Sequence, residues 1–129
     1  MTEVLFICQH NAGRSQLAAA LLEHLTGDRY TVTSAGVSPA DGVNPAVAAS
    51  VAELGLDIAD RSPRAVTEVD LERADVVVLM KPGLALPSQP RGSVLQWEFP
   101  DPTAWDVESV RPLRDAVAVR IEREFVPAR

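Results

Sequence analysis

The sequence predicts an α/β domain with a mainly parallel sheet, because strand-like and helical segments alternate along its 129 residues. The expected strands are short and rich in apolar or β-branched residues: 4–7, 30–35, 75–80 and 93–97. The expected helices carry apolar residues at helical spacing: 14–25, 45–54, 69–74 and 107–125. The length fits a single domain, residues 1–129, and strands joined through helices imply right-handed crossovers.

The first two expected helices have clear boundaries. One face of the helix at 14–25 is apolar, and Gly27 follows its end. Asn44 and Pro45 start the next helix, as an N-cap residue and a proline at the first helical position. Its apolar face is expected to end at Leu54, just before Gly55.

The second half of the chain contains the most apolar strand. Residues 76–80 are all apolar, which predicts a strand buried on both faces, as in a parallel sheet. A loop at 81–92 follows, and loops at the carboxyl ends of parallel strands often line sites. The last helix presents one apolar face, formed by Val110, Leu113, Val117 and Ile121.

Composition excludes several classes of function. The net charge is −6 with both signs interspersed, so no basic stripe favours nucleic acid. No stretch approaches the 18 apolar residues that suggest a membrane span. One cysteine and two histidines leave no metal-ligand spacing, and a single free cysteine fits a reducing cytosol. We therefore expect a soluble cytoplasmic protein without a bound metal or cofactor.

The only cysteine opens a loop between the first strand and the first helix, Cys8-Gln-His-Asn-Ala-Gly-Arg-Ser15. A loop that runs into a helix directs several backbone N–H groups at one point, where the helix dipole adds positive charge. Asn11 and Gly13 tolerate the positive φ of a tight concave loop. We expect an oxyanion to be held by this loop: Gln9, His10, Asn11, Ala12, Gly13, Arg14 and Ser15.

Within this loop, Cys8 has the surroundings of a nucleophile. The helix N-terminus and Arg14 favour a thiolate, and the Ser15 hydroxyl is placed to donate to it. The Arg14 guanidinium matches an oxyanion in two-point geometry. The side chain of His10 has two open placements, toward the anion or toward solvent.

The C-x5-R-S string resembles the low-molecular-weight protein tyrosine phosphatase superfamily, and Gln16 after Ser15 resembles its arsenate reductase branch. The resemblance extends over nearly the whole chain, through Ser34-Ala35-Gly36 and a Trp-Glu-Phe-Pro-Asp-Pro run at 97–102. It implies a flavodoxin-like strand order 2-1-3-4 with helices on both faces of the sheet. It also implies that Ser34, Asn11 and Ser15 support the anion loop.

Asp101 is the second expected catalytic group. It lies between two prolines, which hold its carboxylate on a stiff loop suited to a general acid. The resemblance implies the same role for this position. Trp97 and Trp105 flank the loop, and packing is the simpler interpretation of both, with a place in the site wall as the alternative.

Two reactions share this expected machinery. An arsenate reductase needs a second thiol, and the resemblance implies either two further cysteines in the chain or an external low-molecular-weight thiol. Residues 81–83 are Lys-Pro-Gly, and no other cysteine is present, so we expect an external thiol such as mycothiol, followed by a mycoredoxin-like small redoxin. The alternative is a phosphatase that hydrolyses phosphate monoesters through a cysteinyl phosphate. A non-catalytic oxyanion-binding module would not need Cys8.

Overall fold

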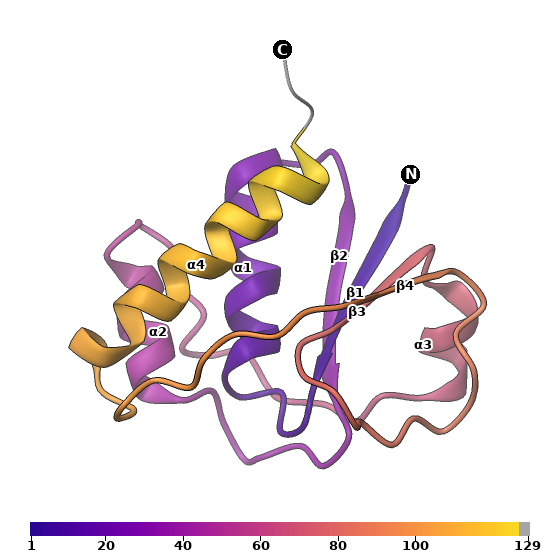
Figure 1. The fold of residues 1–129 in the computed structure, drawn as a ribbon, viewed down its shortest axis with the longest axis horizontal. Helices are drawn as coiled ribbons and strands as arrows, with labels where there is room; N and C mark the ends of the chain where they lie inside the picture. Colours follow the sequence, from indigo (N-terminus) through magenta and orange to yellow (C-terminus); the bar gives the residue numbers. More distant parts are fainter. Residues whose placement is uncertain (127–129) are drawn as a thin grey trace.

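The sheet of the computed structural model, which describes residues 1–126, has four strands that all run parallel. The strands are β1 (Glu3–Cys8), β2 (Thr31–Gly36), β3 (Val76–Leu79) and β4 (Ser93–Gln96). Their order across the sheet is β2-β1-β3-β4, which confirms the order that the resemblance implied (Figure 1). β1 therefore lies in the middle of the sheet, and the loop that follows it starts from its most buried strand.

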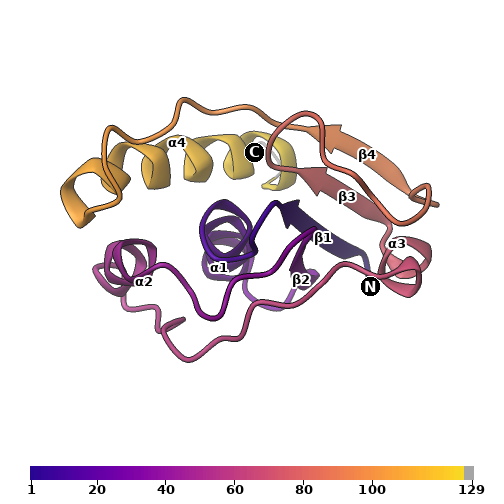
Figure 2. The ribbon, with the colours of Figure 1, turned by 90° about the horizontal axis from the view of Figure 1, so that it is seen from below.

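Helices cover both faces of this sheet, as expected. They are α1 (Arg14–Thr26), α2 (Pro45–Ala52), α3 (Glu68–Arg73) and α4 (Val107–Phe125). Figure 2 shows α1, α2 and α4 on one side of the strands and α3 on the other. None of the helices formed by residues 1–126 is long and apolar enough to cross a membrane.

Alternate residues of β1 divide the core into two layers. Val4, Phe6 and Cys8 pack among buried residues of α1, α2 and α4, whereas Leu5 and Ile7 pack against residues of the α3 side such as Leu71. Each fully buried aliphatic side chain of this kind contributes about 1.5–3 kcal/mol to folding. Because both faces of β1 are buried, a one-residue shift in its register would disrupt both layers.

The end of α2 differs from the expectation. Asn44 caps the helix as predicted, since its side chain accepts from the backbone N–H groups of Ala46 and Val47. The helix ends at Ala52, however, and Leu54 lies beyond it with 38% of its surface exposed. The reason is a turn in which Gly55 adopts a φ of +83°, which directs the chain away from the helix axis.

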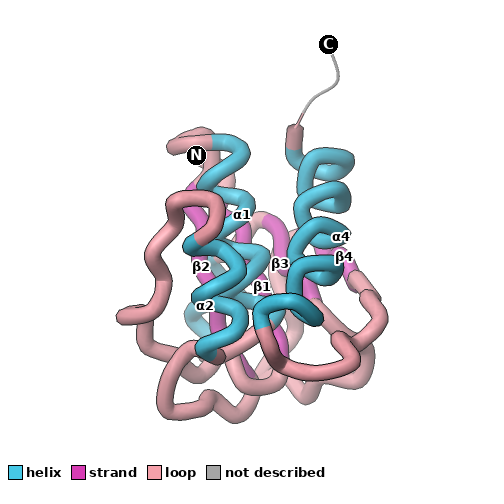
Figure 3. Tube along the Cα trace, turned by 90° about the vertical axis from the view of Figure 1, so that its left-hand side faces the viewer, coloured by secondary structure: helices cyan, strands magenta, loops and turns pink. Residues whose placement is uncertain are grey.

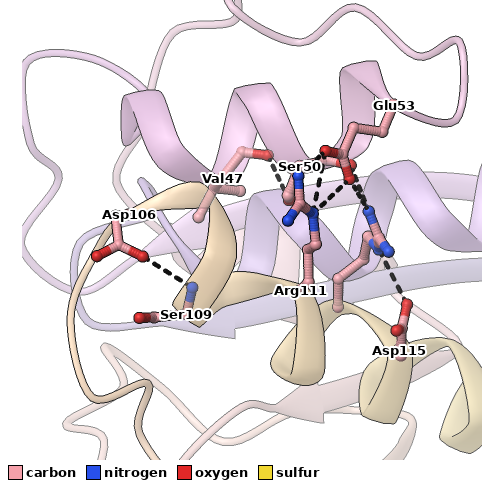
Figure 4. Close-up of polar contacts among 8 residues, drawn as sticks. Val47, Ser50, Glu53, Asp106, Ser109, Arg111 and Asp115 are labelled. Atoms are coloured by element: carbon pink, nitrogen blue, oxygen red, sulfur yellow. Dashed lines mark hydrogen bonds and ion pairs between the residues drawn. The ribbon is translucent and has the colours of Figure 1, made fainter.

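An ion-pair cluster joins α2 to α4. Glu53 accepts from Arg111 and Arg114, each at a shortest distance of 2.6 Å, and Figure 4 shows Arg111 directed from α4 toward Glu53. Hydrogen bonds from these two arginines lower the pKa of Glu53 to about 2. Arg114 also donates to the backbone carbonyl of Ser50 at 2.9 Å. The cluster thereby ties the first half of α4 to α2, just after the loop that carries Asp101.

The loops that follow the strands gather at one end of the molecule, which Figure 3 shows at the end opposite the described C-terminal part of α4. This arrangement follows from a parallel sheet, because the carboxyl ends of all its strands share one edge. The segment after β1 and the Asp101 segment after β4 therefore meet there, through Arg14 and Asp101.

Candidate active site

The loop between β1 and α1 is held by its carbonyl groups. The carbonyls of Cys8, Gln9, His10 and Ala12 accept hydrogen bonds of 2.7 to 3.1 Å from backbone N–H groups within residues 37–44. Because these carbonyls face the neighbouring segment, the intervening N–H groups face the opposite way, into the curve of the loop. The result is a concave row of amide donors at the end of the central strand.

This concavity forms a pocket of about 220 Å³ at the N-terminus of α1. Its lining contains most of the expected oxyanion-binding residues, Trp105, for which a place in the site wall was the alternative interpretation, and Asn44, which was not expected there. The full lining is Cys8, Gln9, His10, Ala12, Gly13, Arg14, Asn44 and Trp105. No acceptor among residues 1–126 takes the backbone N–H groups of His10, Ala12, Gly13 or Arg14. The helix begins at Arg14 without a side-chain cap, so its first amides and its dipole also serve this pocket.

Asn11 is the buried support of the loop. It has a φ of +50°, as the loop was expected to need, and its side chain is fully buried. Gly13, for which a positive φ was also expected, has a φ of −119° instead. Its Oδ1 accepts from the backbone N–H of Arg64 at 3.0 Å, and its Nδ2 donates to Ser15 Oγ at 2.8 Å. A backbone N–H can only donate, so Arg64 determines which way the Asn11 amide points.

The direction of this chain of hydrogen bonds continues to the cysteine. Ser15 Oγ already accepts from Asn11, and its own hydrogen is free to point at Cys8 Sγ, 2.8 Å away. The backbone N–H of Asn11 also donates to Cys8 Sγ, at 3.3 Å. Two donors therefore converge on the sulfur, and donors favour the thiolate over the thiol.

Gln16 is a polar residue whose structural role the sequence did not indicate. It is 98% buried, and its Nε2 donates to Asn11 Oδ1 at 3.3 Å. Among the described residues, none donates to its buried Oε1. Its contact with Asn11 follows from its place in the first turn of α1, five residues along the chain.

The end of β2 supports the loop through Gly36. A Cβ atom on Gly36 would lie 2.7 Å from the backbone nitrogen of Asn11 and 3.0 Å from the carbonyl oxygen of Gln9, so only glycine fits there. Ser34, expected as a support, pairs with Phe6 in the sheet register and lines a hollow beside Gln16. No hydrogen bond within residues 1–126 joins its hydroxyl to the loop, and its role stays a prediction.

His10 lies at the rim of the pocket, with its Nδ1 3.0 Å from the carbonyl oxygen of Ser38. A carbonyl oxygen only accepts, so Nδ1 carries the hydrogen in this contact and Nε2 is left for other partners. The side chain is exposed and is tied to the segment at 37–44. The sequence left two positions open for this side chain, toward the anion or toward solvent. In the structure His10 lines the pocket and is also exposed to solvent.

Arg14 and Asp101 meet on the other side of the loop. Their side chains form an ion pair, in which 17% of the Arg14 side chain and 77% of the Asp101 side chain are exposed. The two residues line a second hollow of about 210 Å³ that also contains Lys81 and Phe99. Because Arg14 lines both hollows, its guanidinium lies between the Cys8 loop and the expected acid.

The two tryptophans have different environments. Trp97 is 1% exposed and packs against Phe6, Phe99 and Phe125. It is therefore a core residue, as the packing interpretation of the sequence predicts. Trp105 is 45% exposed and lines the pocket that contains Cys8. The alternative interpretation, a place in the site wall, therefore applies to Trp105 alone.

Residues 3–124 match the family model described as "Low molecular weight phosphotyrosine protein phosphatase". The chain belongs to this family. Two relatives named arsenate reductase, from Bacillus cereus (strain Q1) and Brevibacillus brevis, are 32% and 30% identical to it. Each comparison covers 93% of this chain and 91% of the relative.

Solved structures of family members have the same fold. A thioredoxin-dependent arsenate reductase of Corynebacterium glutamicum has a TM-score of 0.82 and 35% identity, over 95% of this chain and 59% of that longer one. A structure described as an arsenate reductase in the phosphate binding state has a TM-score of 0.81 and 29% identity, over 95% of both chains. A low-molecular-weight protein tyrosine phosphatase from T. tengcongensis, at 22% identity, has a TM-score of 0.80 over 95% of this chain and 97% of that one.

Proposed function

We propose that this chain is an arsenate reductase that transfers arsenate to an external low-molecular-weight thiol. The observation that carries the proposal is the position of Cys8 Sγ, which accepts two hydrogen bonds at the base of an amide-lined pocket beside Arg14. The arsenate reductase names of the relatives support the choice of oxyanion. Arsenate has the charge and tetrahedral shape that such a pocket of donors binds.

In the proposed first step, arsenate binds to the loop amides and to the Arg14 guanidinium, which releases Asp101 from its ion pair. A thiol sulfur attacks arsenic, a sulfur–arsenic bond forms, and one arsenic–oxygen bond breaks. The proton that the attacking thiol loses passes to the Asp101 carboxylate, and Asp101 then gives it to the departing hydroxyl group, which leaves as water. Arsenic remains As(V) in this step.

Reduction then needs a second thiol. Its sulfur attacks the sulfur of the arsenic–thiol adduct, a disulfide forms, and the electron pair of the sulfur–arsenic bond stays on arsenic, which leaves as arsenite. Two sulfur atoms together lose two electrons, and As(V) becomes As(III). The 129 residues contain only Cys8, so at least one of these two thiols comes from outside the chain.

The expected external thiol is mycothiol. A mycoredoxin-like small redoxin is expected to take part in the reduction step as the protein partner. The chain has Lys81-Pro82-Gly83 just after β3, where an internal relay would need a cysteine. The chain therefore lacks the second cysteine that is needed when thioredoxin reduces a disulfide between two cysteines of the enzyme itself. We propose that the reaction takes place in the cytoplasm, where a free cysteine stays reduced.

A phosphatase is the second candidate, because the same pocket suits a phosphate monoester. Cys8 would attack phosphorus, Asp101 would protonate the leaving oxygen, and water would hydrolyse the cysteinyl phosphate. The observation that favours it is Trp105, an exposed aromatic side chain beside the pocket that an aryl group can contact.

Cys8→Ser tests the chemical role of the sulfur. The variant is expected to lose arsenate reduction while it still binds phosphate, since the loop amides and Arg14 remain. Turnover is followed as arsenite formed with mycothiol and a mycoredoxin, and binding by calorimetry with phosphate. Arsenate reduction at the wild-type rate by Cys8→Ser would contradict the proposed function.

A further inference from the structure

Trp105 lies directly over the anion loop. Its ring atoms Cη2 and Cζ3 are 3.5 and 3.6 Å from the point that a Cβ atom on Gly13 would occupy. The ring therefore covers Gly13 at van der Waals distance and forms one wall of the Cys8 pocket. A larger residue at position 13 would press against this ring.

The backbone next to Trp105 is held by the start of α4. The next residue, Asp106, caps α4 by accepting from the backbone N–H of Ser109 at 2.8 Å. α4 is in turn tied to α2 through Glu53. A tryptophan held at a helix start offers a flat contact surface with few rotatable bonds, so it loses little entropy when a ligand binds.

The rest of the pocket wall indicates what kind of molecule the ring contacts. Gln9, His10 and Asn44 supply polar groups, and Arg14 is the one permanently charged residue of the lining. The oxygen of the Asn44 side chain is used by the start of α2, which leaves its amide hydrogens for another acceptor. Once an oxyanion occupies Arg14, the part of the lining formed by residues 1–126 offers a second molecule the polar groups of Gln9, His10 and Asn44 but no further permanent charge.

We propose that Trp105 is the specificity-determining residue for the thiol co-substrate and binds its uncharged, ring-shaped body, a sugar. The ring of the sugar packs on the indole, its hydroxyl groups reach the polar side chains of the rim, and its thiol arm extends toward the oxyanion at Cys8. A peptidic thiol with two carboxylates finds no permanent cation in this lining once Arg14 is occupied, so it is expected to bind more weakly than an uncharged, hydroxyl-rich thiol. The proposal rests on the proposed function, since it assigns the second substrate of that site.

The test compares Trp105→Ala with Trp105→Phe, and uses S-methyl mycothiol, which cannot react, as the probe. In the presence of phosphate, calorimetry is expected to show about tenfold weaker binding to Trp105→Ala and little change for Trp105→Phe, since one aromatic contact of about 1.4 kcal/mol corresponds to that factor. The ratio of kcat/KM for mycothiol to that for mercaptoethanol is expected to fall by about the same factor in Trp105→Ala. Val119→Ala, an exposed apolar position on α4, serves as the control and is expected to match the wild type.

Equal binding of S-methyl mycothiol to wild type and Trp105→Ala would overturn the proposal. A rise in KM for para-nitrophenyl phosphate in Trp105→Ala, with unchanged binding of S-methyl mycothiol, would overturn it in favour of a platform for aryl esters. Arsenate turnover with mycothiol is measured separately on the wild type. Its absence would contradict the proposed function, whereas the calorimetric comparison decides the role of Trp105 in either case.

Discussion

The guanidinium of Arg14 forms an ion pair with the carboxylate of Asp101. In the proposed reaction, each of these groups has a different partner: Arg14 binds the oxyanion, and Asp101 protonates a leaving oxygen. The Arg14 guanidinium is therefore engaged by the Asp101 carboxylate until an oxyanion arrives. Since 77% of the Asp101 side chain is exposed, the pair is weak enough for an incoming dianion to replace it.

Asp101→Asn is expected to have opposite effects on binding and on turnover. Phosphate affinity rises a few-fold, by roughly the 0–1 kcal/mol of an exposed pair, because a competing charge is removed. Turnover falls by a factor of roughly 100 to 10,000, the usual contribution of a positioned acid. Calorimetry with phosphate and steady-state arsenate reduction measure the two effects.

Glu98→Gln is the matched control for this experiment, because it removes one negative charge from the same hollow without touching the ion pair. It is expected to change neither quantity substantially. An unchanged rate in Asp101→Asn would remove Asp101 from the mechanism, and weaker phosphate binding would show that the carboxylate does not compete with the oxyanion.

Ser15→Ala is expected to slow the alkylation of Cys8 by iodoacetamide about tenfold at neutral pH, because a hydrogen bond to a charged group contributes roughly 1.5 kcal/mol. The substitution removes the donor 2.8 Å from Cys8 Sγ. Ser93→Ala, on the exposed edge strand β4, is the control and should leave the alkylation rate unchanged. Equal alkylation rates in Ser15→Ala and wild type would show that the hydroxyl does not stabilise the thiolate.

Gly36→Ala is expected to displace the anion loop, because the added methyl group would lie 2.7 Å from the backbone nitrogen of Asn11. Such overpacking costs about 1–3 kcal/mol of stability, and phosphate binding weakens with it. Thermal unfolding with and without phosphate measures both losses. Gly42→Ala provides the comparison, since nothing lies within 4 Å of a Cβ atom there. Identical behaviour of the two variants would argue against close support of the loop by β2.

Glu53→Gln is expected to lower the melting temperature near neutral pH by an amount that shrinks in acid. The pKa of Glu53 is about 2 in the folded chain, below its usual 4.5, because Arg111 and Arg114 donate hydrogen bonds to the carboxylate. The ionised carboxylate therefore adds stability above about pH 4.5, and this stability is lost as the pH falls from 4.5 toward 2. Melting curves of both proteins across this interval measure the difference. Glu122→Gln, at an exposed position on α4, is the control and is expected to keep the wild-type melting temperature near neutral pH.

The fold was predictable because its signals are local. Residues 76–79 of the apolar run form a parallel strand next to β1, and Asn44-Pro45 starts a helix as its chemistry requires. The prediction for Leu54 was wrong for a reason that is also local: the apolar residue continues the helical spacing, but the turn at Gly55 ends the helix first. Hydrophobic spacing alone does not distinguish these outcomes.

The candidate site was predictable where its residues adjoin in sequence and, for Asp101, from the two flanking prolines and the family resemblance. Cys8, Arg14 and Ser15 lie within one loop, so their chemistry indicated their proximity. The hydrogen bond from the backbone N–H of Arg64 to Asn11 joins residues that are 53 positions apart. Because the donor is a backbone group, the type of residue at position 64 does not predict this contact. The role of Trp105 was left open because a tryptophan can occupy either a core position or an exposed position in a site wall. Only the tertiary structure shows that Trp97 is buried and Trp105 is exposed.

The measurement that tests the central claim most directly is arsenate-dependent thiol consumption by the purified protein. One sample contains mycothiol with a mycoredoxin, a second contains thioredoxin with its reductase, and a third contains para-nitrophenyl phosphate in place of arsenate. We predict arsenite formation only in the sample with the small thiol, because Cys8 has no second cysteine in the chain to form a disulfide with. Hydrolysis of the phosphate ester without any arsenate turnover would contradict it and would identify the chain as a phosphatase.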